Sequence, residues 1–175
     1  SPGNSIGLIN VAGDISFGPG STLIIETEGV SGAADLVAAT GSAMLSGGTL
    51  SLMMADPAAN WSNAYTVLTA DGGVAGSFDN VSSNAGSTFL STEVDYGATA
   101  VTVQMARNNV AFADYAVTAN ERAAANALDA LPQSSALYGA VVVQDGAGAT
   151  EAFDALSGDI HASLKTGLIE DSRYV

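Results

Sequence analysis

The sequence contains no cysteine among its 175 residues. Disulfide bonds, thiolate chemistry and cysteine-ligated metals are therefore excluded. Basic residues are almost as scarce: Arg107, Arg122, Lys165 and Arg173 oppose 18 acidic residues, which gives a formal net charge of −14. Such a chain repels phosphate backbones, so nucleic acid is not an expected partner. An acidic, solvated surface of this kind is typical of secreted proteins.

Long apolar runs and targeting segments are also missing. No stretch reaches the ~20 apolar residues that a membrane-spanning helix needs. Ser1-Pro2-Gly3-Asn4 is polar and turn-like, without the basic and apolar regions of a signal peptide. We therefore expect the chain to be a fragment of a longer protein.

The stretch from Ser1 to about Arg107 is typical of a β domain. Short runs of β-forming residues alternate with turns rich in Gly, Asn, Asp and Ser. A sandwich, a barrel and a β-solenoid all fit short strands with small side chains and frequent turns. The residues that we expect to form the β core are Leu23, Ile25, Leu50, Leu52, Val67, Val101 and Val103.

A repeated turn favours the solenoid among these folds. Gly20-Ser21-Thr22-Leu23 and Gly47-Gly48-Thr49-Leu50 look like one turn-into-strand unit that recurs after 27 residues, and Gly86-Ser87-Thr88-Phe89 is a looser third copy. A repeat of ~20 to 50 residues matches one turn of a solenoid. Composition alone also produces such matches in a chain rich in Gly and Thr, so a sandwich stays open at this point.

The pattern becomes helical after Asn109. Thr118-Ala119-Asn120-Glu121 has the spacing of a capping box, and the alanine-rich segment behind it predicts a helix that ends at Pro132. A second short helix is expected after Ser134 or Ser135.

A third helix is predicted from about Ala149 to Glu170. Several charged residues within it would be costly in lipid. The helix suits a water-filled barrel, or an amphipathic surface packed on the β domain, and its periodicity alone favours the packed surface. Its apolar stripe consists of Phe153, Leu156, Ile160, Leu164 and Leu168.

The C-terminal motifs point to a known family. The segments 153–163 and 168–173, together with Thr118–Pro132 upstream, resemble the helical linker that precedes the β-barrel in one branch of the autotransporter family. The last rungs of the passenger domain in those proteins, often called the autochaperone, are similar to Tyr65–Ala70, Gly76–Phe78 and Val101–Val103, and Ser1–Gly7 is similar to a common opening of their final repeats.

The resemblance implies a mainly β protein at the surface of a Gram-negative bacterium, either associated with the outer membrane or secreted. It implies a right-handed parallel β-helix over residues 1–109 and a helical linker over residues 110–175. The expected partner is the protein's own outer-membrane β-barrel, whose first strands would follow Val175.

Histidine chemistry has little support in the sequence. His161 is the single histidine, and its neighbours Asp159 and Ser163 are each two residues away. Residues two apart on a helix do not face each other, so these three cannot form a catalytic triad. A solvated or barrel-facing histidine is the preferred interpretation.

Paired carboxylates are the remaining candidates for chemistry. Glu26 and Glu28 share one strand face, as do Glu93 and Asp95. A polysaccharide lyase generally needs a basic residue, but no Lys, Arg or His precedes Arg107. The spacing of known calcium loops is missing as well. We therefore expect no catalytic residue, no cofactor and no metal site.

Three functions remain under consideration. We expect a non-catalytic stem that supports the folding, secretion and display of a passenger domain. The alternative is an adhesive or self-assembling β-solenoid, which contacts host or neighbouring cells or forms homo-oligomers and filaments through an exposed β-edge. The third is an enzyme that acts on glycans, which the lack of basic residues disfavours.

Overall fold

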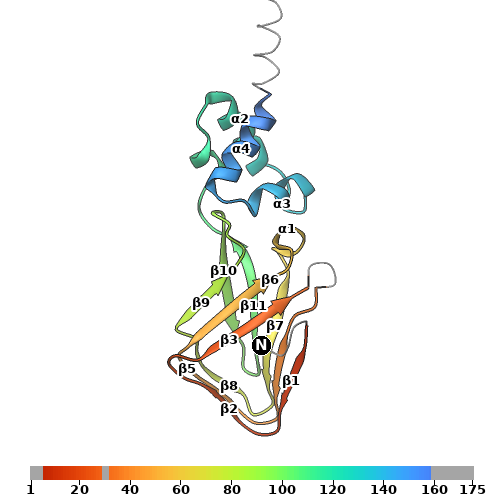
Figure 1. Ribbon diagram of the computed structural model, residues 1–175, viewed down its shortest axis with the longest axis vertical. Helices are drawn as coiled ribbons and strands as arrows, with labels where there is room; N and C mark the ends of the chain where they lie inside the picture. Colours follow the sequence, from red (N-terminus) through yellow and green to blue (C-terminus); the bar gives the residue numbers. More distant parts are fainter. Residues whose placement is uncertain (1–5, 29–31, 159–175) are drawn as a thin grey trace, which may run out of the picture. The chain divides into compact units, whose positions relative to one another are not determined.

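The computed structural model describes residues 6–28 and 32–158 (Figure 1). These residues form two compact units. The first, which we call the β unit, comprises the chain up to Gly86 and the segment Leu90–Arg107. The second, the helical unit, comprises Ser87–Phe89 and the chain from Asn108 onward. Ser87–Phe89 falls within residues 1–109, where a β domain was expected, but this segment belongs to the helical unit.

The β unit is built from short strands and one short helix, α1 (Pro57–Asn60). The mainly β class predicted for this region is confirmed. The strands are β1 (Leu8–Val11), β2 (Ile15–Phe17), β3 (Thr22–Thr27), β4 (Leu36–Ala39), β5 (Ala43–Ser46), β6 (Thr49–Met54), β7 (Ala64–Ala70), β8 (Val74–Ser77), β9 (Asn80–Ser83), β10 (Leu90–Tyr96) and β11 (Ala100–Arg107).

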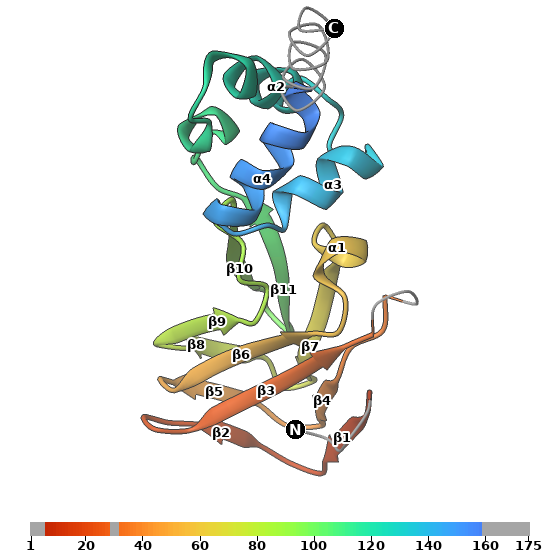
Figure 2. The same ribbon diagram turned by 45° about the horizontal axis from the view of Figure 1, so that its top comes forward.

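Successive triplets of strands stack on one another to form three sheets (Figure 2). The first sheet has the order β1-β4-β7-β11-β10, the second β2-β5-β8 and the third β3-β6-β9. The strand pairs between successive triplets are all parallel. Each triplet is thus one turn of the chain, and each turn supplies one strand to each sheet.

The repeat found in the sequence coincides with the register of the third sheet. Thr22 pairs with Thr49, and Leu23 pairs with Leu50. Gly48 has a φ of +87°, and a Cβ at this position would lie 2.4 Å from the Ser21 hydroxyl oxygen. Only glycine fits a turn that combines a positive φ with so close an approach to the turn below.

The third copy of the repeat, Gly86–Phe89, is not a turn of the stack. The register partner of Thr49 in the next turn is Asn80, which follows Asp79 rather than a glycine. The Asp79 carboxylate accepts a hydrogen bond from the Gly48 backbone N–H at 3.3 Å, so an acidic residue occupies the position of Ser21 and Gly48 in the earlier turns. The spacing also widens from 27 to 31 residues, which hides the repeat.

The interior of the β unit consists mostly of aliphatic side chains. The seven residues expected in the β core are all buried: Leu23 and six residues that are fully inaccessible to solvent, namely Ile25, Leu50, Leu52, Val67, Val101 and Val103. Inward positions alternate with outward ones along β3 and β6, so that one face of each strand supplies the core.

The parallel stacking ends earlier than the sequence suggested. Val101–Val103 lies in β11, which pairs antiparallel with both β7 and β10. The chain reverses between β10 and β11, where the Gly97 backbone N–H bonds to the Ala100 carbonyl at 2.9 Å. A tight reversal can join only antiparallel neighbours. The prediction of parallel rungs as far as residue 109 is therefore wrong beyond β9.

The helical unit contains a 3₁₀ turn and three α-helices: η1 (Phe112–Tyr115), α2 (Ala119–Asp129), α3 (Ala136–Val142) and α4 (Gly146–Ser157). The predicted capping box is present, because the Thr118 hydroxyl accepts from the Glu121 N–H at 3.1 Å and Glu121 accepts from the Thr118 N–H at 3.2 Å. Ser135 is the N-cap residue of α3, although its side chain makes no capping bond.

The third predicted helix differs from α4 at both ends. In the structure, α4 begins at Gly146, where the Asp145 carboxylate caps it. It ends at Ser157 because Gly158 has a φ of +71°. A left-handed residue cannot continue an α-helix, so the prediction of one unbroken helix to Glu170 is wrong at Gly158. Phe153 is fully buried, whereas Leu156 is 44% exposed. The rest of the predicted stripe, Ile160, Leu164 and Leu168, lies outside the described residues.

Candidate functional site: the open end of the strand stack

The first turn of the stack has an open edge. Within residues 6–28 and 32–158, β1 is bonded only to β4, β2 only to β5 and β3 only to β6. Each strand of this turn therefore lies at the edge of its sheet, although the end of β3 is partly covered, because the Glu26 carbonyl accepts from the Asp35 N–H at 2.9 Å. An unpaired strand edge is a template for another strand, because its N–H and C=O groups are available for a new ladder.

Apolar side chains are exposed along the same turn. Leu8 is 55% exposed, Ile9 38% and Ile24 37%. These side chains belong to β1 and β3, so the open edge offers apolar surface as well as backbone groups. A further turn placed on this edge would pair with these backbone groups.

The other end of the stack is treated differently. The β10–β11 hairpin bonds to the last turn: the Ala98 carbonyl accepts from the Val74 N–H at 2.8 Å, and the Thr99 carbonyl accepts from the Ala70 N–H at 2.9 Å. The Tyr96 hydroxyl accepts from the Phe78 N–H at 3.1 Å. The hairpin thus satisfies backbone groups that a further parallel turn would otherwise take.

Several acidic residues hold the turns together. Asp35 is fully buried, and its two carboxylate oxygens accept from the Gly7 and Glu26 N–H groups at 2.8 and 2.9 Å. Asp14 accepts from the Ser42 N–H at 2.7 Å, across two successive turns. This role was not predicted from the sequence, although an aspartate just before the start of a strand is a visible signal at both positions and at Asp79.

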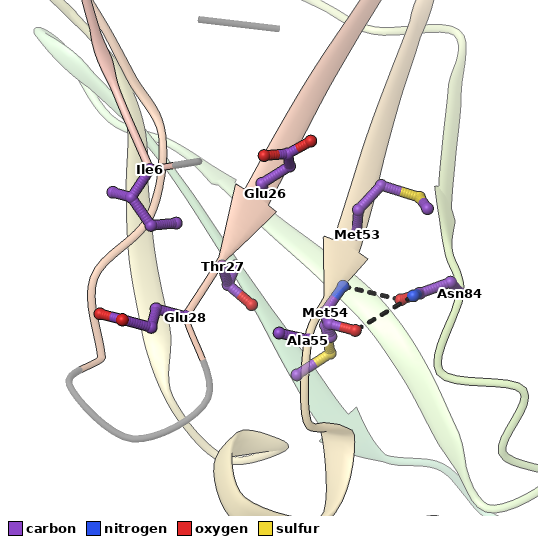
Figure 3. A pocket seen from close by; sticks show the side chains of 8 residues that line it. All are labelled: Ile6, Glu26, Thr27, Glu28, Met53, Met54, Ala55 and Asn84. Atoms are coloured by element: carbon purple, nitrogen blue, oxygen red, sulfur yellow. Dashed lines mark hydrogen bonds between the residues drawn. The ribbon is translucent and has the colours of Figure 1, made fainter. Parts of the chain in front are cut away.

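Glu26 and Glu28 line a cavity of about 380 Å³ near the ends of β3 and β6 (Figure 3). Thr27 and Asn84 also line it, but Asn84 is engaged with the Met54 backbone, from which it accepts at 2.7 Å and to which it donates at 3.1 Å. The remaining lining is formed by Ile6, Met53, Met54 and Ala55. The two carboxylates predicted to share a face do come together here.

The second predicted carboxylate pair lies on the outer hairpin. Glu93 and Asp95 line a hollow of about 410 Å³ with Val94, Thr102 and Gln104, and the Gln104 amide nitrogen lies 3.5 Å from a Glu93 oxygen. No Lys, Arg or His is among the residues that line either hollow.

Metal sites and membrane spans were also sought in the described part of the chain. There, no group of three or more His, Asp or Glu residues is placed to hold a metal ion. None of its helices combines the length and hydropathy needed to cross a bilayer. His161 lies outside the described residues.

Comparison with known proteins gives one informative similarity. No family model matches the chain. The chain is 31% identical over 140 residues to an extracellular serine protease of Serratia marcescens. It is similar to a part of an extracellular bacterial protein. The match covers 75% of this chain but only 13% of the protease, so the chain spans about an eighth of that protein's length. The activity of the whole protease therefore says nothing directly about these residues.

Proposed function

We propose that the chain is a non-catalytic stem of an autotransporter passenger, and that it supports the folding, secretion and display of that passenger outside the cell. In this proposal the stacked triplets are the last turns of a right-handed parallel β-helix. The similarity to a part of an extracellular protease supports the location. The helices that follow would lead toward the protein's own outer-membrane β-barrel.

The difference between the two ends of the stack carries the proposal. In the described residues, β1, β2 and β3 all lie at the edges of their sheets at one end, whereas at the other end β8 and β9 lie at edges but β7 is bonded to β11 of the hairpin. A further turn can therefore pair with all three strands of a turn at the first end only. A passenger segment that precedes residue 6 would add its last turn to β1, β2 and β3.

Growth from the open edge would be favourable at every step. Each added turn gains a ladder of backbone hydrogen bonds and removes apolar side chains from water. Each docked turn becomes the open edge for the next turn. Because the folded turns are stable outside the cell, they would oppose movement of the chain back into it. The described residues need no catalytic group for this role.

A matched pair of variants tests the stem function. In the complete protein, with its barrel, we expect Leu52→Asp to reduce surface display strongly, because Leu52 is fully buried and a carboxylate there has no partner. Met53→Asp, one residue away and 42% exposed in the native chain, should leave display near the wild-type level. Antibody labelling of intact cells measures both. Normal display of Leu52→Asp would contradict the proposal.

Self-assembly is a second candidate function, favoured by the same open edge. A released fragment with unpaired β1, β2 and β3 could stack on a second copy and form oligomers or filaments. Light scattering and electron microscopy over a range of concentrations measure this directly. We expect Ile24→Lys to suppress any assembly, because a charge on an edge strand opposes pairing. A chain that stays monomeric at all concentrations would rule out this alternative.

A further inference from the structure

Three residues between β9 and β10 belong to the helical unit, and we call Ser87–Phe89 the anchor segment. The Ser87 hydroxyl donates to the Val142 carbonyl at 2.6 Å, and the Thr88 N–H donates to the Gln144 carbonyl at 3.1 Å. These two acceptors lie at and just beyond the C-terminal end of α3, where a helix leaves its carbonyls without intrahelical partners. The anchor segment therefore completes the end of α3.

Phe89 extends the aromatic core of the helical unit. It is fully buried, and its ring meets those of Phe112 and Tyr115 edge to face, with centroid separations of 4.8 and 5.6 Å. Phe112 in turn contacts Tyr138 and Phe153, at 5.4 and 6.2 Å. One residue that lies far from the helices in sequence is thus part of the centre of their core.

The anchor segment is also fixed opposite the start of the helical chain. The Asn108 N–H donates to the Phe89 carbonyl at 2.9 Å, and the Asn108 side-chain amide donates to the Thr88 carbonyl at 2.9 Å. The next residues on each side, Leu90 and Arg107, are the first pair in the register of β10 and β11. The helical unit therefore holds together the two chain segments from which the hairpin starts.

We infer that the helical unit sets the register of the β10–β11 hairpin through the anchor segment, and that it forms before the parallel turns do. A slip of one residue between β10 and β11 would point every side chain of one strand to the opposite face. Burial of Phe89 prevents the slip because the ring can enter the aromatic core in one register only. β11 then provides the strand on which β7, and with it the last parallel turn, is built.

In the proposed stem function, the helical unit would be the first part of the stem to fold. The biological role of this folding order rests on that proposed function. Local contacts close faster than contacts between residues far apart in sequence. The capping bonds of the helical unit span three or four residues and the turns of the stack bond over 27 to 31, but the anchor bond from Ser87 to Val142 spans 55. The order of formation is therefore open to direct measurement.

Pulse-labelling hydrogen exchange during refolding of the 175-residue chain tests the order. We expect α2, α4 and the β10–β11 amides to become protected together, before the amides of β3 and β6. In native-state exchange, Phe89→Ala should accelerate exchange at least tenfold in both the helices and the hairpin, while β3 and β6 change less than threefold. Phe78→Ala is the matched control: Phe78 is a buried ring of the β unit that pairs with Phe17 at 5.5 Å, and its loss should spare the helices.

Two results would overturn the inference. One is protection of β3 and β6 before the helices. The other is a Phe89→Ala chain in which the helices loosen but the hairpin exchanges as in the wild type. If Phe89→Ala fails to fold, Ser87→Ala removes the bond to Val142 with a smaller perturbation and should shift exchange in the same two regions. Refolding needs no secretion machinery, so failure here is distinguishable from a failure of the stem function, which surface display of Leu52→Asp measures.

Discussion

In the β unit most of the buried side chains are aliphatic and come in rows, one residue from each turn, whereas the helical unit buries a cluster of aromatic rings. Leu50, for example, pairs with Leu23 in the turn before it and with Val81 in the turn after it. Phe112 meets the rings of Phe89, Tyr138 and Phe153. A defect in a row is therefore expected to affect the neighbouring turns, and a defect in the cluster to affect several elements of the helical unit at once.

The largest expected effect is at that centre. Phe112→Ala removes a fully buried ring from a cluster of aromatic partners, and should lower the free energy of unfolding of the helical unit by about 4 kcal/mol. Urea unfolding followed by circular dichroism at the helical band measures it. Val117→Ala, at a position that is 77% exposed, is the control and should change stability by less than about 0.5 kcal/mol. Equal effects of the two variants would show that the rings do not hold the unit together.

The corresponding change in the β unit is expected to be somewhat smaller. Leu50→Ala leaves a cavity in the middle turn and should cost about 3 kcal/mol. Trp61 is the single tryptophan and lies in the β unit, 6% exposed, so its fluorescence reports unfolding of this unit separately. Met53→Ala at an exposed position of the same strand is the control. If Leu50→Ala lowered the free energy of unfolding by less than Met53→Ala does, the row of buried aliphatic residues would not be the source of the stability of the β unit.

A second comparison concerns one buried carboxylate in each unit. Asp35 uses both of its oxygens, one for Gly7 and one for Glu26, and so joins segments that are 28 and 9 residues away. Glu121 uses a single oxygen for the Val117 and Thr118 N–H groups, at 2.6 and 3.2 Å. The first arrangement is a tertiary contact and the second a local cap.

The amide variants of these two residues should therefore differ. Asp35→Asn turns an NH₂ group toward a buried N–H and should destabilise the β unit by about 2 kcal/mol. Glu121→Gln keeps one carbonyl oxygen, which is all that the native bonds use, and should cost less than about 1 kcal/mol in the helical unit. Urea unfolding with the two optical signals separates the effects. Equal losses of unfolding free energy in the two variants would mean that the number of accepting carboxylate oxygens does not determine the effect of the amide substitution.

The same contrast explains what the sequence predicts well. Aliphatic residues at every second position, such as Leu23 and Ile25, are predicted to point into the core together, because a strand presents every second side chain to one face. The capping box at Thr118 is read from four consecutive residues. Both features are determined by neighbours in the chain, and the structure has them where the pattern indicates.

Features that depend on contacts between residues far apart in the sequence were not predicted, because no local pattern encodes them. Gly86–Phe89 has the local pattern of a turn into a strand, yet its place is decided by the Phe112 ring and by the end of α3. The antiparallel direction of β11 depends on a reversal that its own alternation does not encode. The role of Asp35 needs two partners in other turns. Sequence periodicity identifies strands and buried faces, but not which distant segment lies against them.

A small expected effect at the same cap sharpens the comparison of local with distant bonds. Thr118→Ala removes the hydroxyl that accepts from the Glu121 N–H, and should destabilise the helical unit by about 1 kcal/mol. The β unit should be unaffected, because this bond spans three residues within the helical unit, so Trp61 fluorescence should report an unchanged urea midpoint. Thr118→Ser keeps a hydroxyl acceptor and should restore most of the loss. If Thr118→Ala shifted the urea midpoint of Trp61 fluorescence as far as that of the helical signal, the two units would unfold as one. The segments at residues 86–90 and 107–108, where the chain passes from one unit to the other, would then couple their stabilities.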